Sequence, residues 1–257
     1  MSVIAQAGAK GRQLHKFGGS SLADAKCYLR VAGIMKEYSQ AGDMMVVSAA
    51  GSTTNQLISW LKLSQSDRLA AHQVQQSLRR YHTELIGGLL EPAAADTLIA
   101  AFIHDLERLA GLLDGGVSEA VYAEVVGHGE VWSARLMAAV LNQLGMEAAW
   151  LDARAFLRAE RAAQPQVDEG LSYPLLQQLM AQHPNKRLVV TGFISRNQAG
   201  ETVLLGRNGS DYSATQIGAL AGASRVTIWS DVAGVYSADP RKVKDACLLL
   251  SLIHISE

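Results

Sequence analysis

Apolar positions near the start of the chain first form a short run and then recur at a longer spacing. Residues 13–17 (QLHKF) suit a short strand that ends at two glycines. The following apolar residues recur near helical spacing, which predicts a helix that begins near Leu22 and stops at Gly42. The continuous apolar run 44–50 (MMVVSAA) is typical of a buried parallel strand. Strand, glycine turn, helix and strand together predict a βαβ unit.

Residues 54–145 have a different pattern. They consist of long, helix-favouring segments rich in leucine and alanine, with Pro92 at the expected first position of one helix. Gly127 and Gly129 interrupt the last of these segments. We expect a helical insertion that packs beside the sheet and is not a separate domain.

The alternation of strand and helix patterns returns after this region. Four further strands are predicted, at residues 147–152, 187–194, 202–206 and 225–232. A hairpin is expected around residues 198–200, and residues 210–223 are expected to form a helix with Ser210 or Asp211 at its N-cap. The expected fold class is therefore α/β, with a mostly parallel sheet covered by helices on both faces.

Composition and charge narrow the function classes. The 257 residues fit one large α/β domain or two small ones, and the net charge of −1, from 23 basic and 24 acidic residues, argues against a nucleic-acid partner. Cys27 and Cys247 are far apart, so we expect two buried or inert thiols and not a disulfide or a metal site. The N-terminus lacks the apolar core of a signal peptide, and no apolar run is long enough to span a membrane. We expect a soluble, cytoplasmic protein without a membrane partner.

The hexapeptide KFGGSS at residues 16–21 is the first candidate anion site. A Walker A loop carries its lysine after the glycines, whereas Lys16 precedes them, so this is not a P-loop. Gly18 and Gly19 still allow backbone N–H groups to approach an anion, and the next helix would direct its positive end to the same place. Lys16 adds a charge at the strand end. The alternative is a simple turn between a strand and a helix.

A second glycine-rich turn, residues 204–214 (LLGRNGSDYSA), also follows a strand and opens a helix. Two such turns in one sheet suggest that two anions meet beyond the strand ends, where open α/β sheets bind ligands. Arg207 suits a carboxylate or a phosphate. Asp211 is equally well explained as a helix cap, which does not exclude a role in the site.

A third segment, residues 229–241 (WSDVAGVYSADPR), leaves a strand at Ser230 and Asp231 and continues into a loop with an aromatic and a cationic residue. Such a loop can serve the nucleotide side of a site. An ordinary surface loop is the alternative.

Five motifs occur in the order seen in aspartokinases: KFGGSS, SAAGSTTNQL, GHGE, GRNGSDYSA and WSDVAGVYSADPR. From about residue 12 to about residue 246 the chain closely resembles the N-terminal kinase part of bifunctional aspartokinase/homoserine dehydrogenases, in particular the methionine-branch form. The order of five motifs makes this resemblance far more specific than a single pair of glycines.

The resemblance implies the amino-acid kinase fold, a three-layer α/β/α sandwich. It implies an amino-acid-binding lobe at about 12–190 and a nucleotide-binding lobe at about 191–247. The implied reaction is phosphoryl transfer from Mg-ATP to the side-chain carboxylate of L-aspartate, giving 4-phospho-L-aspartate, the first step toward lysine, methionine and threonine. The full-length parent would be a homo-oligomer. Residues 248–257 do not resemble the family's continuation and read as an atypical tail on a truncated kinase domain.

By position, the resemblance also implies roles for individual residues. Lys16 and Asp211 would be catalytic, and Gly18, Gly19, Ser20 and Gly209 would bind phosphate. Substrate would be bound by Thr54, Glu130, Arg207 and Ser210, and the nucleotide by Ser230, Asp231, Tyr236 and Arg241. No protein ligand for a metal is implied, because Mg²⁺ would arrive with the nucleotide.

The chemistry of the reaction agrees with these residue types. An aspartate side chain is already ionised at neutral pH, so the reaction needs no general base and Asp211 would orient Lys16 or a metal-bound water. Glu130 would take the substrate ammonium and Arg207 a substrate carboxylate, although a surface position on a helix is the plain alternative for Glu130. The glycines around Glu130 suggest close backbone approach. His128 between them is expected to be structural or solvent-facing.

Two positions depart from the family pattern: Asn208 replaces a glycine and Ser230 a threonine. Asparagine tolerates positive φ well, and serine keeps the hydroxyl. Two alternatives stay open, namely a related kinase that uses acetylglutamate or a nucleoside monophosphate, and a folded but catalytically silent fragment. A dinucleotide-binding domain is excluded, because no G-x-G-x-x-G is present.

Overall fold

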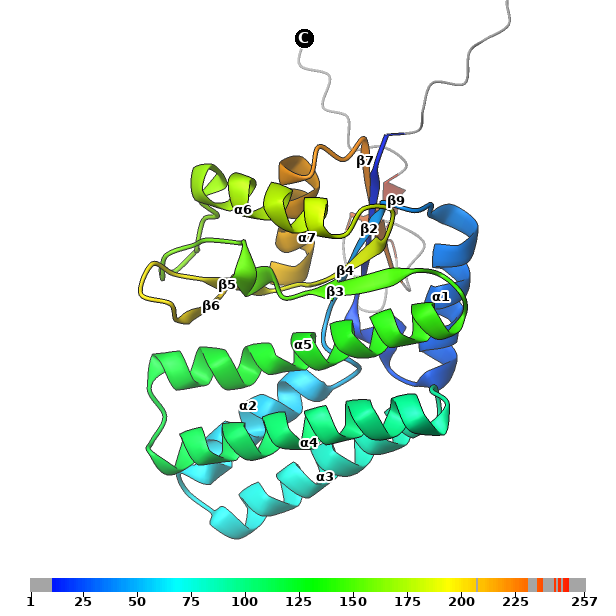
Figure 1. Cartoon of the computed structure of the whole chain (residues 1–257). Coiled ribbons are helices and arrows are strands. Elements are labelled where there is room, and N and C mark those ends of the chain that lie inside the picture. Colours follow the sequence, from blue (N-terminus) through cyan, green and yellow to red (C-terminus); the bar gives the residue numbers. More distant parts are fainter. Residues whose placement is uncertain are drawn as a thin grey trace, which may run out of the picture.

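The computed structural model describes residues 11–206, 208–230, 235–237, 243, 245 and 247–249. At its centre is a five-stranded sheet in which all neighbouring strands run parallel (Figure 1). In order across the sheet, the strands are β3 (Ala148–Leu151), β4 (Arg187–Thr191), β2 (Met44–Val47), β1 (Gln13–Phe17) and β7 (Arg225–Trp229). The predicted α/β class with a mostly parallel sheet is confirmed.

Helices cover both faces of the sheet, and the central strand β2 is buried on both. Met45 and Val47 pack into one core cluster with α1 (Ala25–Tyr38) and α5 (Glu119–Gln143). The alternate residues Met44 and Val46 pack into a second cluster with α6 (Glu169–Gln182) and α7 (Gly209–Leu220). A strand buried on both faces carries apolar residues at every position, which explains the unbroken apolar run.

The helices predicted between residues 54 and 145 are present as α2 (Thr53–Ser64), α3 (Arg68–Gly87), α4 (Pro92–Asp114) and α5. Pro92 is the first residue of α4, as expected. Helices α2, α3 and α4 pack on the side of α5 that faces away from the sheet (Figure 1). One layer of helices therefore separates the outer three from the strands.

The predicted interruption of α5 at Gly127 and Gly129 is wrong, because the helix runs through both positions. The glycines serve close packing instead. A Cβ at Gly129 would lie 2.9 Å from the Ala49 Cβ, and one at Gly127 would lie 2.5 Å from the Ile194 Cγ2. The expected close backbone approach is thus confirmed, and it presses α5 against the loop that follows β2.

The start and end of α1 also differ from the prediction. Residues Gly19–Leu22 form a short 3₁₀ helix, η1, and α1 begins only at Ala25. Asp24 caps the helix by accepting a hydrogen bond of 2.8 Å from the Cys27 amide. The helix ends at Tyr38, before Gly42. The N-terminus of α1 is therefore displaced by one short turn from the two glycines.

The helix after the second glycine turn is capped by Asn208 and not by Ser210 or Asp211. Asn208 adopts the left-handed conformation with φ of 56°. Asparagine is among the residues most tolerant of this conformation, in agreement with the substitution of glycine noted in the sequence. Asp211 consequently lies in the first turn of α7, where its side chain is available for another partner.

The strand predicted at 187–194 divides into two. After β4 the chain turns at Phe193, whose φ is 65°, and continues as β5 (Ile194–Arg196). Strand β5 pairs antiparallel with β6 (Thr202–Leu204), so the predicted hairpin is confirmed. Beyond the central sheet, β8 (Val235–Tyr236) pairs antiparallel with β9 (Leu248–Leu249), the only part of the 248–257 tail within the described residues.

Both cysteines are free thiols, but neither is buried: Cys27 is half-buried and Cys247 is exposed. None of the helices in the described part of the chain is long and apolar enough to cross a membrane.

Candidate functional site

The turns that follow β1, β2 and β6, together with the start of α7, enclose a cavity of about 300 Å³. Its position at the carboxyl ends of parallel strands is where open α/β sheets bind ligands. Eight of the residues singled out in the sequence line it: Lys16, Gly18, Gly19, Thr54, Glu130, Gly209, Ser210 and Asp211. The fold therefore brings together residues that are far apart along the chain.

The centre of the cavity wall is an ion pair between Lys16 and Asp211. The Lys16 Nζ lies 2.6 Å from the Asp211 Oδ1, and the two side chains are 11% and 40% exposed. Lys16 stands near the end of β1, whereas Asp211 projects from the first turn of α7. The pair thus connects the first glycine turn to the second.

The glycine turn after β1 is pressed against the turn after β2. The Gly51 amide donates a hydrogen bond of 3.0 Å to the Gly19 carbonyl. A Cβ at Gly19 would lie 2.7 Å from the Ala49 carbonyl oxygen, which no ordinary side chain could tolerate. Glycine is therefore required at this position by contact with the neighbouring backbone.

The N-terminus of α7 borders the cavity through Gly209, Ser210 and Asp211. A Cβ at Gly209 would lie 2.6 Å from the Phe193 Cδ2, so glycine permits this close approach as well. The positive end of the helix dipole and the ammonium of Lys16 consequently act on the same space. Such an arrangement favours the binding of an anion.

Glu130 stands on α5 in the wall of the cavity and is only 3% exposed. The plain alternative of a surface glutamate is therefore wrong. Its Oε2 has no hydrogen-bond partner among the described residues. Burial raises the pKa of Glu130 well above its usual range, because removal from water penalises the charged form more than the Ala49 amide and Lys16 favour it.

The remaining sequence candidates lie elsewhere or outside the described residues. Ser20 and Ser230 are both exposed, and neither lines the cavity. Arg207, Asp231 and Arg241 fall outside the described residues, and Tyr236 lies in β8 with a side chain that the structure does not describe. Arg207 nevertheless stands between Gly206 and Asn208, which both line the cavity.

Six lining residues carried no individual role in the sequence analysis. Ser48, Ala49 and Gly51 come from the turn after β2, Phe193 comes from the bend after β4, and Gly206 and Asn208 come from the turn before α7. The glycine after a buried apolar run was a usable signal for the first three. Phe193 gave no such signal, because its left-handed backbone is uncommon for a bulky residue.

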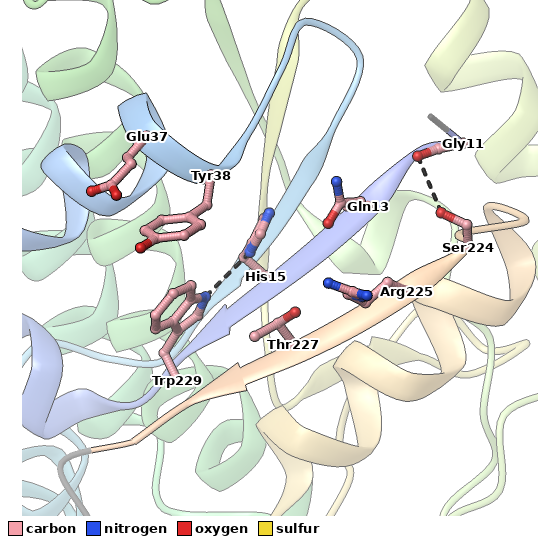
Figure 2. A pocket seen from close by; sticks show the side chains of 9 residues that line it. All are labelled: Gly11, Gln13, His15, Glu37, Tyr38, Ser224, Arg225, Thr227 and Trp229. Carbon is pink, nitrogen blue, oxygen red and sulfur yellow. Dashed lines mark hydrogen bonds between the residues drawn. The ribbon is translucent and has the colours of Figure 1, made fainter. Parts of the chain in front are cut away.

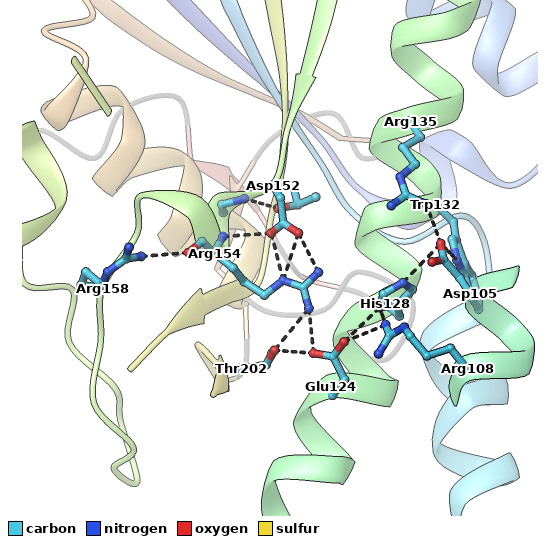
Figure 3. Close-up of polar contacts among 12 residues, drawn as sticks. Asp105, Arg108, Glu124, His128, Trp132, Arg135, Asp152, Arg154, Arg158 and Thr202 are labelled. Atoms are coloured by element: carbon cyan, nitrogen blue, oxygen red, sulfur yellow. Dashed lines mark hydrogen bonds and ion pairs between the residues drawn. The ribbon is translucent and has the colours of Figure 1, made fainter. Parts of the chain in front are cut away.

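His128 is buried and structural, and the solvent-facing alternative is wrong. Its ring lies 3.4 Å from Asp105 and 3.6 Å from Glu124 (Figure 3). Glu124 in turn pairs with Arg108 at 2.9 Å and with Arg154 at 2.7 Å. This network joins α4 and α5 to the hairpin region and does not line the cavity.

A larger hollow of about 610 Å³ lies between the end of α1 and the β1–β7 edge of the sheet (Figure 2). Trp229 spans one end of it and donates a hydrogen bond of 3.2 Å to the His15 Nδ1. None of the residues singled out in the sequence lines this hollow. The smaller cavity is therefore the candidate site, because it unites both glycine turns at the strand ends.

Within the described part of the chain, no group of three or more His, Cys, Asp or Glu side chains is arranged to hold a metal ion. The polar groups of the described lining residues are instead backbone amides, hydroxyls, the side-chain amide of Asn208 and one ammonium, with two carboxyl groups. This set suits an anionic ligand better than a bare cation.

Comparisons with known proteins agree with this geometry. The bifunctional aspartokinase/homoserine dehydrogenase 2 of Escherichia coli (strain K12) is 86% identical over 249 residues, which are 97% of this chain and 31% of that protein. An aspartokinase of Chlamydia pneumoniae is 34% identical over 236 residues, which are 91% of this chain and 50% of that protein. A crystal structure of E. coli aspartokinase III in complex with aspartate and ADP has a TM-score of 0.84 at 28% identity, covering 93% of this chain and 53% of that one.

The chain thus spans about a third of the first of these relatives and about half of the other two. Residues 11–257 match the sequence profile of the amino acid kinase family. Since this match includes every described residue, the chain belongs to the amino acid kinase family.

Proposed function

We propose that this chain transfers a phosphoryl group from Mg-ATP to the side-chain carboxylate of L-aspartate and forms 4-phospho-L-aspartate. The observation that carries the proposal is the Lys16–Asp211 ion pair of 2.6 Å at the junction of two glycine turns. The similarity to an E. coli aspartokinase/homoserine dehydrogenase and to an aspartokinase structure with aspartate and ADP supports the choice of both substrates.

The reaction requires charge neutralisation more than proton transfer. The side chain of aspartate has an ordinary pKa of about 3.9, so it reaches the site as an anion. The obstacle is the repulsion between this carboxylate and the triphosphate, and fixed positive charge at their meeting point reduces it. Lys16 supplies such a charge, and its burial strengthens the interaction by excluding water.

The other residues of the cavity position the two substrates. Asp211 holds the ammonium of Lys16 in place and abstracts no proton, because the nucleophile carries none to remove. Gly18, Gly19 and Gly209 let phosphate oxygens approach backbone N–H groups. We assign three further cavity side chains with hydroxyl or carboxyl groups to the amino acid: Thr54, Ser210 and Glu130.

Several assignments extend this proposal beyond the cavity. We propose that Arg207 binds a carboxylate of the amino acid, and that Ser230, Asp231, Tyr236 and Arg241 contact the nucleotide. Ser20 would contact a phosphate only after a movement of its turn, because it does not line the cavity. Mg²⁺ would arrive with the triphosphate and reduce its charge.

The broader context is also a proposal. Residues 12–190 would form the amino-acid lobe and residues 191–247 the nucleotide lobe of a kinase domain. The full-length parent would be a cytoplasmic homo-oligomer that also carries homoserine dehydrogenase and serves the methionine branch.

Trapping of the acyl phosphate with hydroxylamine tests the proposed reaction. We expect hydroxamate with ATP and L-aspartate, and little with acetylglutamate. Release of ADP with a nucleoside monophosphate or another acceptor, but not with L-aspartate, would overturn the proposal. Weak product with L-glutamate would not, because one methylene group changes recognition by only about 1–3 kcal/mol.

A further inference from the structure

Glu130 is the least solvated ionisable group in the cavity. It is 3% exposed, and its position in the wall lets it meet a bound ligand without any rearrangement of α5. The Ala49 amide donates a hydrogen bond to the carboxyl group, whereas the Oε2 atom lacks a partner in the described structure. A carboxyl oxygen that is buried and unpaired in this way is costly when the group is charged.

Among the described residues, the charged groups near Glu130 would not compensate a negative charge on its carboxyl group. From β1, Lys16 is the nearby cation, but its ammonium is already paired with Asp211 of α7 at 2.6 Å. Among the described residues that line the cavity, an ionised Glu130 would therefore leave two carboxylates against one ammonium. The pull of Lys16 on the pKa of Glu130 is outweighed by burial.

The other helices packed around Glu130 supply no further charge. On α1, burial raises the pKa of Tyr28, which stays neutral and shares a hydrogen bond of 2.9 Å with Ser133. On α3, burial lowers the pKa of His82 to about 3, so its ring is neutral as well. On α2, Thr54 contributes only a hydroxyl to the cavity. Within the described part of the chain, Glu130 thus faces one cation, and that cation is already shared with Asp211.

We propose that Glu130 holds a proton in the empty cavity and releases it to solvent when the ammonium group of the amino acid binds. The ammonium then replaces the proton as the positive partner of the buried carboxylate. One N⁺–H···O⁻ contact forms, the carboxyl O–H bond breaks, and the proton passes to water. This inference rests on the proposed function, since it takes the acceptor to be an α-amino acid.

Proton release makes Glu130 a specificity-determining residue for the charge of the acceptor. Succinate offers the same two carboxylates as aspartate without the ammonium, so its binding does not stabilise the ionised form of Glu130. Aspartate affinity should rise about tenfold per pH unit until the pH reaches the pKa of Glu130 in the empty site, and should then level off. Succinate affinity should lack this rise.

Infrared spectroscopy of the unliganded chain tests the first half of the proposal. A protonated, buried carboxyl gives a carbonyl stretch that an ionised one lacks. We expect this band at neutral pH, its absence from Glu130→Gln, and its retention in Glu119→Gln, a matched change at an exposed site of the same helix. No such band in the unliganded chain would overturn the proposal, because Glu130 would then be ionised when the cavity is empty.

Calorimetry of aspartate binding in two buffers of different ionisation enthalpy tests the second half. With the nucleotide site filled by a non-hydrolysable ATP analogue, we expect about one proton released per aspartate near neutral pH. We expect none for succinate, and none for aspartate with Glu130→Gln. Aspartate binding without proton release in the unaltered chain would overturn the inference and leave the proposed reaction intact.

The two hypotheses can fail separately. If the chain phosphorylates another acceptor and does not bind aspartate, the proposed function fails and the inference about the ammonium fails with it. If aspartate is phosphorylated with no proton release, only the inference fails. The comparison of aspartate with succinate uses the unaltered chain, so it remains decisive even if Glu130→Gln does not fold.

Discussion

The ammonium of Lys16 lies 2.6 Å from the carboxylate of Asp211, and this contact joins the end of β1 to the first turn of α7. Lys16 is nearly buried, whereas Asp211 is about 40% exposed. The pair is therefore neutral as a unit while its cation already points into the cavity. An anionic ligand that approaches Lys16 meets an ammonium whose position is set in advance, which lowers the cost of ordering it.

Replacement of Lys16 by alanine should strongly reduce turnover and preserve the fold. Removal of one positive group at a site of developing negative charge costs on the order of 10²–10³-fold in kcat. The unfolding free energy should fall little, because the abandoned partner Asp211 can be solvated. Hydroxamate formation and thermal melting would measure the two effects. Loss of cooperative melting would show that Lys16 has a structural role instead.

Replacement of Asp211 by asparagine should reduce kcat by about 10–100-fold, because Lys16 would lose the anion that positions it. KM for aspartate should change less than kcat, since the ammonium itself remains. Asp96→Asn, at an exposed position of α4, is the matched control and should behave like the unaltered chain. A pH–rate profile that loses an essential basic group in Asp211→Asn would contradict a purely positioning role.

The central fold could be predicted because its strands appear in the sequence as short apolar runs. The run at β2 is apolar at every position since helices cover both of its faces. The expectation that two glycine turns meet at one edge also follows from parallel topology, because the carboxyl ends of β1 and its neighbours lie together.

Other features depend on tertiary contacts that local pattern does not record. Gly127 and Gly129 looked like helix breaks, yet each is required by a neighbouring element only a few ångströms away. The burial of Glu130 follows from the same close packing of α5, and could not be separated from a surface position by its spacing alone. The left-handed bend at Phe193 ended a strand that the apolar pattern extended to residue 194.

Gly19→Ala should damage both stability and activity. The new Cβ would lie 2.7 Å from the Ala49 carbonyl oxygen, so the turns after β1 and β2 would have to separate. We expect a loss of about 1–3 kcal/mol in the free energy of unfolding and a higher KM for ATP. Gly33→Ala is the matched control, because Gly33 lies in helix α1 and a Cβ there would meet nothing within 4 Å.

A separate prediction concerns the control variant Gly33→Ala. Alanine is favoured over glycine inside a helix by about 0.5–1 kcal/mol, so Gly33→Ala should be neutral or slightly stabilising. Denaturant titration of both variants would measure the difference. Equal stability of Gly19→Ala and Gly33→Ala would contradict the close approach of the two turns.

Glu124→Gln should destabilise the fold without a direct effect on the cavity. The carboxylate accepts hydrogen bonds from Arg154 at 2.7 Å, Arg108 at 2.9 Å and Thr202 at 2.6 Å (Figure 3). An amide cannot accept all three, and loss of the charge leaves Asp152 as the one anionic partner of the largely buried Arg154 among the described residues. We expect a cost of about 2 kcal/mol in the free energy of unfolding.

The test of this network is a comparison with Glu107→Gln, which alters an exposed glutamate of α4. Denaturant titration should show the cost for Glu124→Gln only. The contacts of Glu124 lower its pKa, so the unaltered chain should lose this contribution as the pH falls below about 4.5. If the unfolding free energy of Glu124→Gln fell below about pH 4.5 as steeply as that of the unaltered chain, the stabilising role of the Glu124 carboxylate would be contradicted.

His82 should make stability sensitive to mild acid. Its ring is buried between Phe102 and Trp132, shares a hydrogen bond of 3.1 Å with Thr53, and has its pKa lowered to about 3 by burial. The unfolded chain binds a proton at this residue near pH 6.5, whereas the folded chain does not. Stability is therefore complete above pH 6.5 and falls as the pH decreases toward 3.

The expected slope is about 1.4 kcal/mol per pH unit from this one residue below pH 6. Unfolding free energies at pH 7.5 and pH 5.5 would measure it, in a range where most carboxyl groups stay ionised. His82→Gln should be less stable at both pH values and should lose the slope, because glutamine does not titrate. His72→Gln alters an exposed histidine of the same helix, α3, and should keep the slope. An equal slope in all three chains would show that His82 accepts a proton in the folded state, so that its burial does not hold the ring neutral.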